Sequence, residues 1–280
     1  MQNFEGKVCV ITGAASGIGR ECALQIGLKN RAQLALFDIN SEKLNDVVRE
    51  VNDQGGNAIG IICDVSNEQQ VKEGIEKTVE TYGRLDYLAS NAAAVSASFT
   101  MKDRTFDDFD VDYMMEAFKI NACGGYLLMK YAIPEMLKNG GGSIVCTSSV
   151  AAKFGAAGNN VYGMTKAALE ALVRATAALY GRQGIRCNAI EPSNTLTPAF
   201  METIPAELYE TMKLGIYNPN FTEGDKIASV VAFLLSDDAY TIQGATIPVD
   251  NGYHIVAGMV GALDGREAAL KSLQEKKNGC

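Results

Sequence analysis

The sequence predicts a doubly wound α/β fold, in which helices cover both faces of a parallel sheet of about seven strands. The main observation is a strict alternation between short apolar runs and segments with apolar residues at helical spacing. Nearly continuous apolar runs are typical of strands buried on both faces, as in a parallel sheet. No repeat or linker interrupts the alternation, so we expect one domain over residues 1–252 and an extension over 253–280.

Seven apolar runs fit buried strands, and each stops at a Gly, a polar residue or a charged residue. In chain order they are residues 7–11, 33–37, 57–63, 85–89, 143–147, 185–190 and 246–249.

Seven further segments fit helices that cover this sheet, because their apolar residues recur every three or four positions. They are residues 17–29, 41–53, 68–82, 113–137, 160–180, 205–214 and 224–235. We expect Ser41 to cap the second of them and Gly83 to close the third.

Composition excludes several classes of function. A net charge of −8, from 25 Lys+Arg and 33 Asp+Glu, opposes binding to nucleic acid. The uncharged stretch 251–263 is 13 residues long, whereas a membrane-spanning helix needs about 20, so we expect no membrane partner. The seven cysteines form no Cys-x-x-Cys pair, and their odd number fits a reducing compartment. We therefore expect a cytoplasmic protein.

The chain has a single histidine, His254, which we interpret as incidental. Nucleophilic catalysis of the Ser-His-Asp or Cys-His kind needs a histidine beside the nucleophile, and none is available within the predicted domain's core. No cluster of His and Cys has the spacing of metal ligands, so we expect no metal site.

A glycine-rich turn follows the first strand and opens a helix. Gly13, Gly17 and Gly19 are spaced as Gly-x-x-x-Gly-x-Gly, a variant of the dinucleotide-binding fingerprint. Glycines let backbone N–H groups approach a pyrophosphate closely, and the N-terminus of the helix attracts the anion. With Ser16 and Ile18, this turn is the predicted phosphate-binding part of a cofactor site.

Acidic residues after the second and third strands complete the predicted adenosine site. Asp38 can accept hydrogen bonds from the adenosine ribose hydroxyls. It would also repel a 2′-phosphate, and no Lys or Arg lies in the turn or at the two positions after Asp38, which favours NAD over NADP. Asp64 and Val65 follow the third strand, where an adenine would lie.

The spacing Tyr-x-x-x-Lys places a phenol and an ammonium group one helical turn apart, and it occurs three times. The pairs are Tyr126/Lys130, Tyr162/Lys166 and Tyr209/Lys213. Spacing alone does not choose among them. Only Tyr162/Lys166 follows a strand that ends in hydroxyl side chains, at the edge where open α/β sheets bind ligands. We assign Tyr126 to helix packing.

Taken together, the glycine turn, Asn91, Asn121, Ser149, Tyr162 and Lys166 resemble the short-chain dehydrogenase/reductase family. Ser149 stands 13 residues before Tyr162, as in that family, and the resemblance runs from about residue 7 to residue 252. It implies a Rossmann-type fold and an oxidoreductase that transfers a hydride between NAD(H) and an alcohol or ketone.

The resemblance also implies roles for these residues. Tyr162 is the general acid/base, Ser149 holds the substrate oxygen and Asn121 positions a water. Lys166 holds the nicotinamide ribose. A lysine about 5 Å away contributes roughly 3 kcal/mol at an effective dielectric constant of about 20, so we expect Lys166 to lower the pKa of Tyr162 by about 2.

Further cofactor contacts follow from the same resemblance. They are Asn91, Ala92, Tyr162, Lys166, Pro192, Thr195 and Thr197. The sequence departs from the family pattern at Ala93, where a methyl group replaces the usual glycine hydrogen, and at Ser193, where the usual residue after proline is glycine.

The substrate is less well specified. Residues 198–217 correspond to the family's lid and are rich in flexible apolar side chains, which favours a bulky hydrophobic alcohol such as a hydroxysteroid. A polyol or sugar dehydrogenase and a 3-oxoacyl-thioester reductase remain alternatives, and an inactive NAD-binding regulator is the alternative outside enzymes. The acidic stretch 94–112, which includes Asp103, is expected to be a solvated rim. We expect a homodimer or homotetramer, with the extension packed on a neighbouring subunit.

Overall fold

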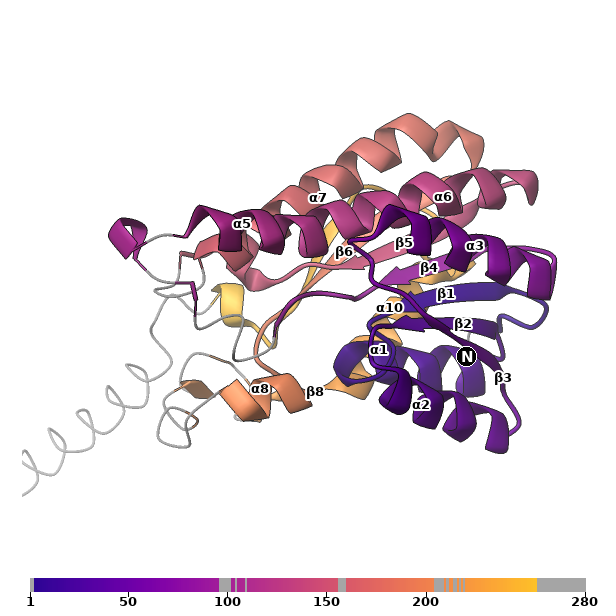
Figure 1. The fold of residues 1–280 in the computed structure, drawn as a ribbon, viewed down its shortest axis with the longest axis horizontal. Helices are drawn as coiled ribbons and strands as arrows, with labels where there is room; N and C mark the ends of the chain where they lie inside the picture. Colours follow the sequence, from indigo (N-terminus) through magenta and orange to yellow (C-terminus); the bar gives the residue numbers. More distant parts are fainter. Residues whose placement is uncertain are drawn as a thin grey trace, which may run out of the picture.

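The computed structural model describes residues 3–95, 102–103, 105–108, 110–155, 160–203, 209, 212–213, 216, 218 and 220–255. Within them, seven parallel strands form one sheet in the order β3-β2-β1-β4-β5-β6-β9 (Figure 1). The strands are β1 (Val8–Thr12), β2 (Gln33–Asp38), β3 (Asn57–Ile62), β4 (Tyr87–Ser90), β5 (Gly142–Thr147), β6 (Ile185–Pro192) and β9 (Thr246–Val249). The predicted fold class is confirmed. The strand order reverses between β1 and β4, and a reversal of this kind opens a ligand crevice at the carboxyl edge of the sheet.

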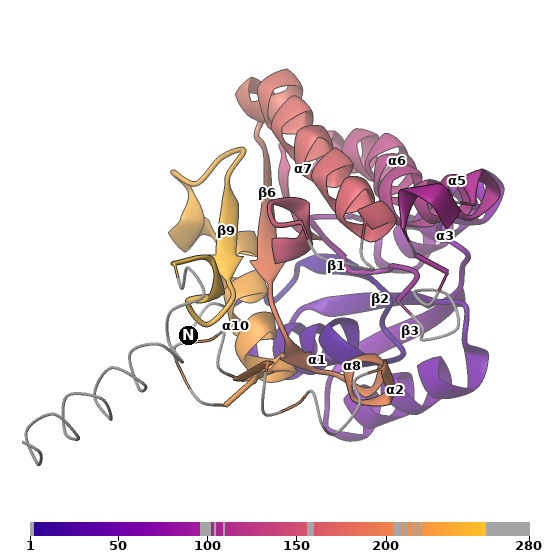
Figure 2. The same cartoon turned by 90° about the vertical axis from the view of Figure 1, so that its left-hand side faces the viewer.

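Helices lie on both faces of the sheet, as Figures 1 and 2 show from two directions. The α-helices are α1 (Gly17–Leu24), α2 (Ser41–Asp53), α3 (Glu68–Tyr82), α5 (Val111–Phe118), α6 (Gly124–Lys138), α7 (Asn160–Tyr180), α8 (Pro198–Thr203) and α10 (Gly224–Leu235). None of the helices in the described ranges is both long enough and apolar enough to cross a bilayer.

Two hydrophobic cores fill the space between the sheet and the helix layers. In β1, Cys9 and Ile11 belong to the core beneath α1, α2 and α10, whereas Val8 and Val10 belong to the core beneath α3, α6 and α7. This alternation is the period of two that a strand imposes. All four are fully buried, which explains why the strand has no polar face in the sequence.

Local details of the helices differ from the predictions. The first and fourth predicted helices are interrupted by π-helical turns, η1 (Gln25–Lys29) after α1 and η3 (Lys119–Cys123) between α5 and α6. The N-cap of α2 is Asn40, whose side chain accepts a hydrogen bond from the Lys43 N–H, so the assignment of Ser41 was wrong by one position. Gly83 ends α3 in the left-handed conformation, as predicted. Most of the predicted helix 205–214 lies outside the described residues.

A second, two-stranded parallel sheet lies beside the main one. Its strands are β7 (Thr195–Leu196), just after β6, and β8 (Thr222–Glu223), just before α10. Thr195 pairs with Thr222 and Leu196 with Glu223. The two ends of the segment between β7 and β8 are therefore adjacent.

Asp86 lies at the amino-terminal ends of the strands, opposite the carboxyl edge, and is 3% exposed. Its carboxylate accepts two hydrogen bonds from Arg84, at 2.8 and 2.6 Å, and one from the Val8 N–H at 3.0 Å. Lys7 adds an ion pair at 3.2 Å. These contacts join the starts of β1 and β4.

Candidate active site

The glycine turn between β1 and α1 is closely packed against the end of β4. Gly13 has φ +64°, and a Cβ there would lie 3.1 Å from the backbone of Ala92. A methyl group at Gly19 would overlap the Gly13 carbonyl oxygen. Both positions therefore require glycine. Ser16 is the exposed N-cap residue of α1, its side chain makes no capping bond, and the first turn carries no acidic residue. Such a helix end favours an anion.

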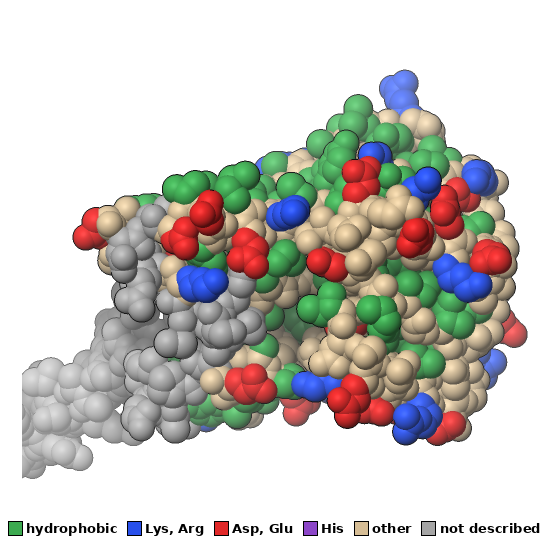
Figure 3. Space-filling view, viewed as in Figure 1, with side chains coloured by type: hydrophobic (Ala, Val, Ile, Leu, Met, Phe, Trp, Pro, Cys, Tyr) green, Lys and Arg blue, Asp and Glu red, His purple; other side chains and the backbone are tan. Residues whose placement is uncertain are grey.

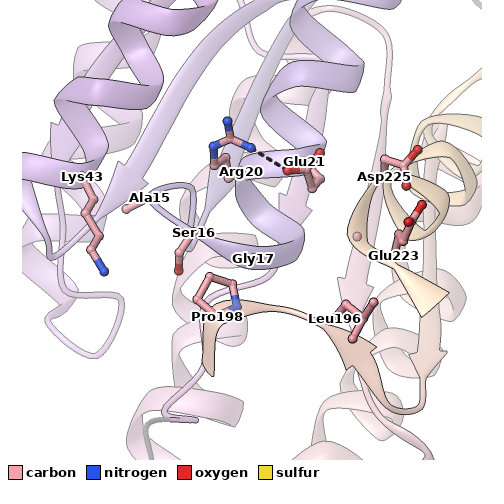
Figure 4. Close-up of a pocket in the computed structure, with 11 residues that line it drawn as sticks. Ala15, Ser16, Gly17, Arg20, Glu21, Lys43, Leu196, Pro198, Glu223 and Asp225 are labelled. Atoms are coloured by element: carbon pink, nitrogen blue, oxygen red, sulfur yellow. Dashed lines mark hydrogen bonds and ion pairs between the residues drawn. The ribbon is translucent and has the colours of Figure 1, made fainter. Parts of the chain in front are cut away.

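Asp38, at the end of β2, is tied to this turn. Its Oδ2 accepts a hydrogen bond from the Ala15 N–H at 3.0 Å, and its Oδ1 accepts one from the Asn40 N–H at 2.9 Å. The carboxylate therefore has a fixed position, and a carboxylate oxygen has a further lone pair for a hydroxyl donor. A pocket of about 560 Å³ opens beside Ala15, and Figure 4 shows Ser16, Lys43 and Pro198 among the residues around it.

Asp64 and Val65, which follow β3 after Cys63, have different surroundings. The Asp64 carboxylate accepts hydrogen bonds from the N–H and the hydroxyl of Ser66, at 2.9 and 2.7 Å. Val65 is buried against Gly124, where a Cβ would come within 2.8 Å of it. The expectation that either residue contacts an adenine stays a prediction.

Asn91 and Ala92 connect three strand ends. Both of their backbone N–H groups donate to the Thr12 hydroxyl at 3.1 Å. The Thr147 hydroxyl donates to the Asn91 Oδ1 at 2.7 Å. The carboxyl ends of β1, β4 and β5 are thereby held at one site.

Ser149, Tyr162 and Lys166 meet at the end of β5. The Ser149 side chain lies close enough to Tyr162 to lower the pKa of its phenol. The Lys166 ammonium donates to the Thr147 carbonyl oxygen at 2.7 Å and lies 5.6 Å from the centre of the Tyr162 ring. The structure thus brings together the hydroxyl, phenol and ammonium groups that the sequence singled out.

The pKa values of the two ionisable groups differ from the expectation. Burial raises the pKa of Tyr162 to about 12, against a lowering effect of the Ser149 hydrogen bond. Burial lowers the pKa of Lys166 to about 8. The predicted fall in the pKa of Tyr162 is therefore wrong for the chain without cofactor, because removal of the phenol from water outweighs the lowering effect of Ser149.

Asn121 lies in the π-helical turn η3 and is 3% exposed. Its side chain accepts from the Ala94 N–H at 2.8 Å and donates to the Thr165 hydroxyl at 3.1 Å. Thr165 donates in turn to the Tyr162 carbonyl oxygen at 2.7 Å. Asn121 therefore connects the segment after β4 to the helix that carries Tyr162, and π-helical turns occur frequently at functional sites.

The segment after β6 closes the site from the other side. Pro192 ends β6, and Thr195 is buried in β7. A Cβ on Gly17 would lie 3.3 Å from the Thr197 Cγ2, so Thr197 lies directly against the glycine turn. Pro192, Thr195 and Thr197 are thus placed along the same edge of the sheet as the glycine turn.

Comparison with known proteins identifies the family. A family described as enoyl-(acyl carrier protein) reductase matches residues 13–254. An uncharacterised oxidoreductase of Thermotoga maritima is 36% identical over 89% of this chain and 98% of its own length. The 7α-hydroxysteroid dehydrogenase of Bacteroides fragilis is 32% identical over 91% of this chain and 97% of its own length. This chain belongs to the short-chain dehydrogenase/reductase family. It is therefore an oxidoreductase.

A solved structure of this dehydrogenase family agrees with the fold. A 7α-hydroxysteroid dehydrogenase complexed with NADH and 7-oxoglycochenodeoxycholic acid has a TM-score of 0.84 and 31% identity, over 89% of this chain and 95% of that one. The resemblance inferred from sequence is confirmed.

Among the described residues, one that sequence reasoning missed is Asp103. It is 5% exposed, and its Oδ2 accepts hydrogen bonds from the backbone N–H groups of Val161, at 2.8 Å, and Tyr162, at 3.2 Å. The expectation of a solvated rim was therefore wrong for Asp103, which accepts hydrogen bonds from backbone N–H groups in the first turn of α7. Aspartate is a common helix cap, but 58 residues separate Asp103 from Val161, so no local pattern reveals the contact.

His254 pairs with a buried carboxylate, and its incidental role in the chemistry stays a prediction. Its Nδ1 lies 2.8 Å from the Oδ2 of Asp250, which is 3% exposed and also accepts from the Gly252 N–H. In the described ranges no group of His, Cys, Asp and Glu is arranged to hold a metal ion.

The two other Tyr-x-x-x-Lys pairs have different surroundings. Tyr126 is 56% exposed in the single chain, so its assignment to helix packing stays a prediction, and Lys130 pairs with Glu68. Lys213 lies over the ring of Tyr209 at 4.6 Å.

Proposed function

We propose that this protein is an NAD-dependent dehydrogenase that interconverts a secondary alcohol and its ketone. The observation that carries the proposal is the grouping of Ser149, Tyr162 and Lys166, in which the Lys166 ammonium lies 5.6 Å from the Tyr162 ring, at the sheet edge that also holds the glycine turn. This combination supplies a proton-transfer group, a donor for the substrate oxygen and a place for a dinucleotide.

The residues present fit NAD. The tight turn that Gly13 and Gly19 permit, together with the uncapped start of α1, suits a pyrophosphate. Asp38 is fixed by two backbone N–H groups and has lone pairs free for the ribose hydroxyls. Its negative charge disfavours a 2′-phosphate. When bound, NAD(H) supplies the acceptor or donor of the hydride.

The side chains of the site transfer the proton and bind the substrate and the cofactor. In alcohol oxidation Tyr162 takes the hydroxyl proton at its Oη, and in ketone reduction it returns a proton there. Ser149 donates a hydrogen bond to the substrate oxygen and stabilises the charge that develops on it. Lys166 holds the nicotinamide ribose, and its positive charge favours the phenolate form of Tyr162. Asn121 holds a water in the proton path.

For the substrate we propose a bulky hydrophobic alcohol of the hydroxysteroid type. Phe154, five residues after Ser149, is 40% exposed and meets the ring of Tyr253 at 5.9 Å. Met201, on α8, is 55% exposed. These side chains offer apolar surface near the site. By contrast, Phe200, a residue of the predicted lid, packs edge-on against Phe221. This apolar side chain therefore contacts the protein itself.

The test is NADH formation across steroid alcohols, polyols and short secondary alcohols, with NADP as the comparison cofactor. We expect turnover of steroid alcohols with NAD, and a loss of at least about 10²-fold in kcat for Tyr162→Phe, because the phenyl ring has no proton to exchange. Tyr126→Phe is the matched control, since it removes a hydroxyl from the same sequence spacing elsewhere, and we expect it to retain full activity.

The outcomes separate the alternatives. Turnover of polyols alone would identify a polyol or sugar dehydrogenase with the same mechanism. Reduction of a 3-oxoacyl thioester alone, with NADPH, would contradict both the substrate and the cofactor. Tight NAD binding without turnover of any alcohol would favour an NAD-binding regulator.

We further propose a single domain over residues 1–252, a cytoplasmic location and assembly into a homodimer or homotetramer. The assembly is supported by apolar side chains on α5, α6 and α7. Val111, Met115, Tyr126 and Leu179 are 56–68% exposed. Figure 3 shows hydrophobic side chains gathered along the upper edge, where Figure 1 has these helices. Exposed apolar surface of this kind marks interaction sites.

A further inference from the structure

A buried cluster of two glutamates and a lysine lies directly behind the candidate active site. Glu170, on α7 one turn beyond Lys166, is 6% exposed, and Glu191, the residue before Pro192, is 2% exposed. Lys153 pairs with the Glu191 Oε2 at 2.6 Å. Carboxylates are almost never fully buried without partners, so this cluster calls for a physical explanation.

The two carboxyl groups lie close enough to affect each other. Burial raises the pKa of Glu191 and the neighbouring Glu170 reinforces this effect, although Lys153 acts in the opposite direction. The Glu191 Oε1 is buried and has no hydrogen-bond donor among the described residues. Two ionised carboxylates cannot donate to each other, whereas one proton held between two neighbouring buried carboxyls removes their repulsion and gives the Glu191 Oε1 a hydrogen-bond partner.

The cluster also connects the elements that carry the active site. The Ser148 hydroxyl donates to the Glu170 Oε1 at 2.6 Å and lies 3.4 Å from the Lys166 carbonyl oxygen. Ser148 directly precedes Ser149, and Lys153 follows Ser149 by one short turn. Glu191 stands at the end of β6. The cluster therefore joins β5, α7 and β6 where Ser149, Lys166 and Pro192 are positioned.

We propose that Glu170 and Glu191 share a single proton, and that this acid pair, neutralised by Lys153, is a positioning element of the active site. With one shared proton the cluster carries one negative and one positive charge and is neutral. Loss of that proton leaves two adjacent buried negative charges, which repel each other and separate β6 from α7.

Other ionisable side chains on the elements packed around the pair have partners of their own. They are Lys166 (the Thr147 carbonyl), Arg186 (the carbonyls at the end of α10), Asp250 (His254) and Cys146 (Cys187). The net charge of the cluster therefore depends on Glu170, Glu191 and Lys153.

The first experiment detects the proton directly by infrared spectroscopy of the full-length chain. We expect the band of a protonated carboxylic acid at pH 7 in the native protein and its absence in Glu191→Gln, whose amide donates to an ionised Glu170. In Lys153→Met the band should persist to higher pH, because the cation that favours ionisation is gone. Glu80→Gln, which changes an exposed glutamate paired with Lys77, should leave the band unchanged. Absence of the band from the native protein at pH 7, or its persistence in Glu191→Gln, would overturn the proposal.

The second experiment tests positioning by kinetics, and it rests on the proposed dehydrogenase activity. In Glu191→Ala we expect kcat to fall by about tenfold or more, because small displacements of reacting groups are costly, while the Kd for NAD changes by less than about threefold. Glu191→Gln, which imitates the protonated carboxyl, should recover most of the kcat and retain activity to higher pH than the native protein. Equal kcat in the alanine variant and the native protein, or an unchanged alkaline limit in the glutamine variant, would contradict the positioning role. The infrared result does not depend on turnover, so failure of the proposed function remains distinguishable.

Discussion

At the residue scale, Ser149 acts on the proton affinity of its neighbour. Its hydrogen bond lowers the pKa of Tyr162 against the larger effect of burial, which raises it to about 12. Removal of the hydrogen bond should therefore raise that pKa further, and the pH at which alcohol oxidation reaches half its maximum should move upward. For Ser149→Ala we also expect kcat to fall by about 10²-fold, since a donor to the developing oxyanion is lost. The pH dependence of kcat/KM measures both effects, and Ser149→Thr, which keeps a hydroxyl, should restore part of the rate.

A second residue-scale prediction concerns Gly19. A methyl group there overlaps the Gly13 carbonyl oxygen, so the turn must move away from the start of α1. We expect Gly19→Ala to lower the free energy of unfolding by about 2 kcal/mol and to weaken NAD binding. Calorimetry of NAD binding and thermal unfolding measure the two effects. Gly55→Ala, at a position with open space around it, should leave the affinity for NAD unchanged.

At the scale of the element, the catalytic helix α7 depends on a cap from a distant segment. Asp103→Ala leaves the N–H groups of Val161 and Tyr162 without their buried acceptor. We expect a loss of about 1 kcal/mol in the free energy of unfolding and a larger effect on kcat than on the Kd for NAD, because Tyr162 stands in the first turn. Asp103→Asn keeps an oxygen acceptor and should recover most of the rate. Equal losses of rate in the two variants would show that charge, not capping, matters.

The strands and helices also show how much of the structure could be predicted from the sequence. The strands were predictable because apolar runs such as residues 7–11 have one cause, burial on both faces. The π-helical turn around Asn121 was not, because one inserted residue changes the helical period too little to read in a short window. Glu191 lies at the end of an apolar run and gave no sign of its partners, because Lys153 and Glu170 approach it only through the fold.

At the scale of the whole molecule, Asp86 makes the free energy of unfolding depend on pH. Burial alone would raise its pKa, but hydrogen bonds from Arg84, the Val8 N–H and Lys7 together hold it below the usual value. A carboxyl whose pKa is lowered by folding stabilises the protein above its unfolded-state pKa, and this contribution disappears as the pH falls through the folded-state value. We expect Asp86→Asn to cost about 2 kcal/mol at pH 7 and less at low pH. Urea unfolding at several pH values measures this, and a constant loss across the range would contradict it.

The assembly is the second property of the whole molecule. Met115 and Tyr126 are both more than half exposed on neighbouring helices. If copies of the chain pack through this surface, a charge placed there should be buried at a large cost and separate them. We expect Tyr126→Glu to reduce the mass measured by light scattering, whereas Arg49→Glu, at an exposed position on α2 on the other side of the sheet, should leave it unchanged. An unchanged mass in Tyr126→Glu would place the interface elsewhere.

The small sheet formed by β7 and β8 has a consequence for how this protein can change over evolution. Because Thr195 pairs with Thr222, the chain between them departs and returns at neighbouring points. The entropic cost of closing such an excursion grows only slowly with its length. Segments of other lengths and compositions can therefore be exchanged at this position while the glycine turn, Tyr162 and Lys166 keep their places. The residues that carry out the reaction and the segment that would contact the substrate can therefore change independently of each other during evolution.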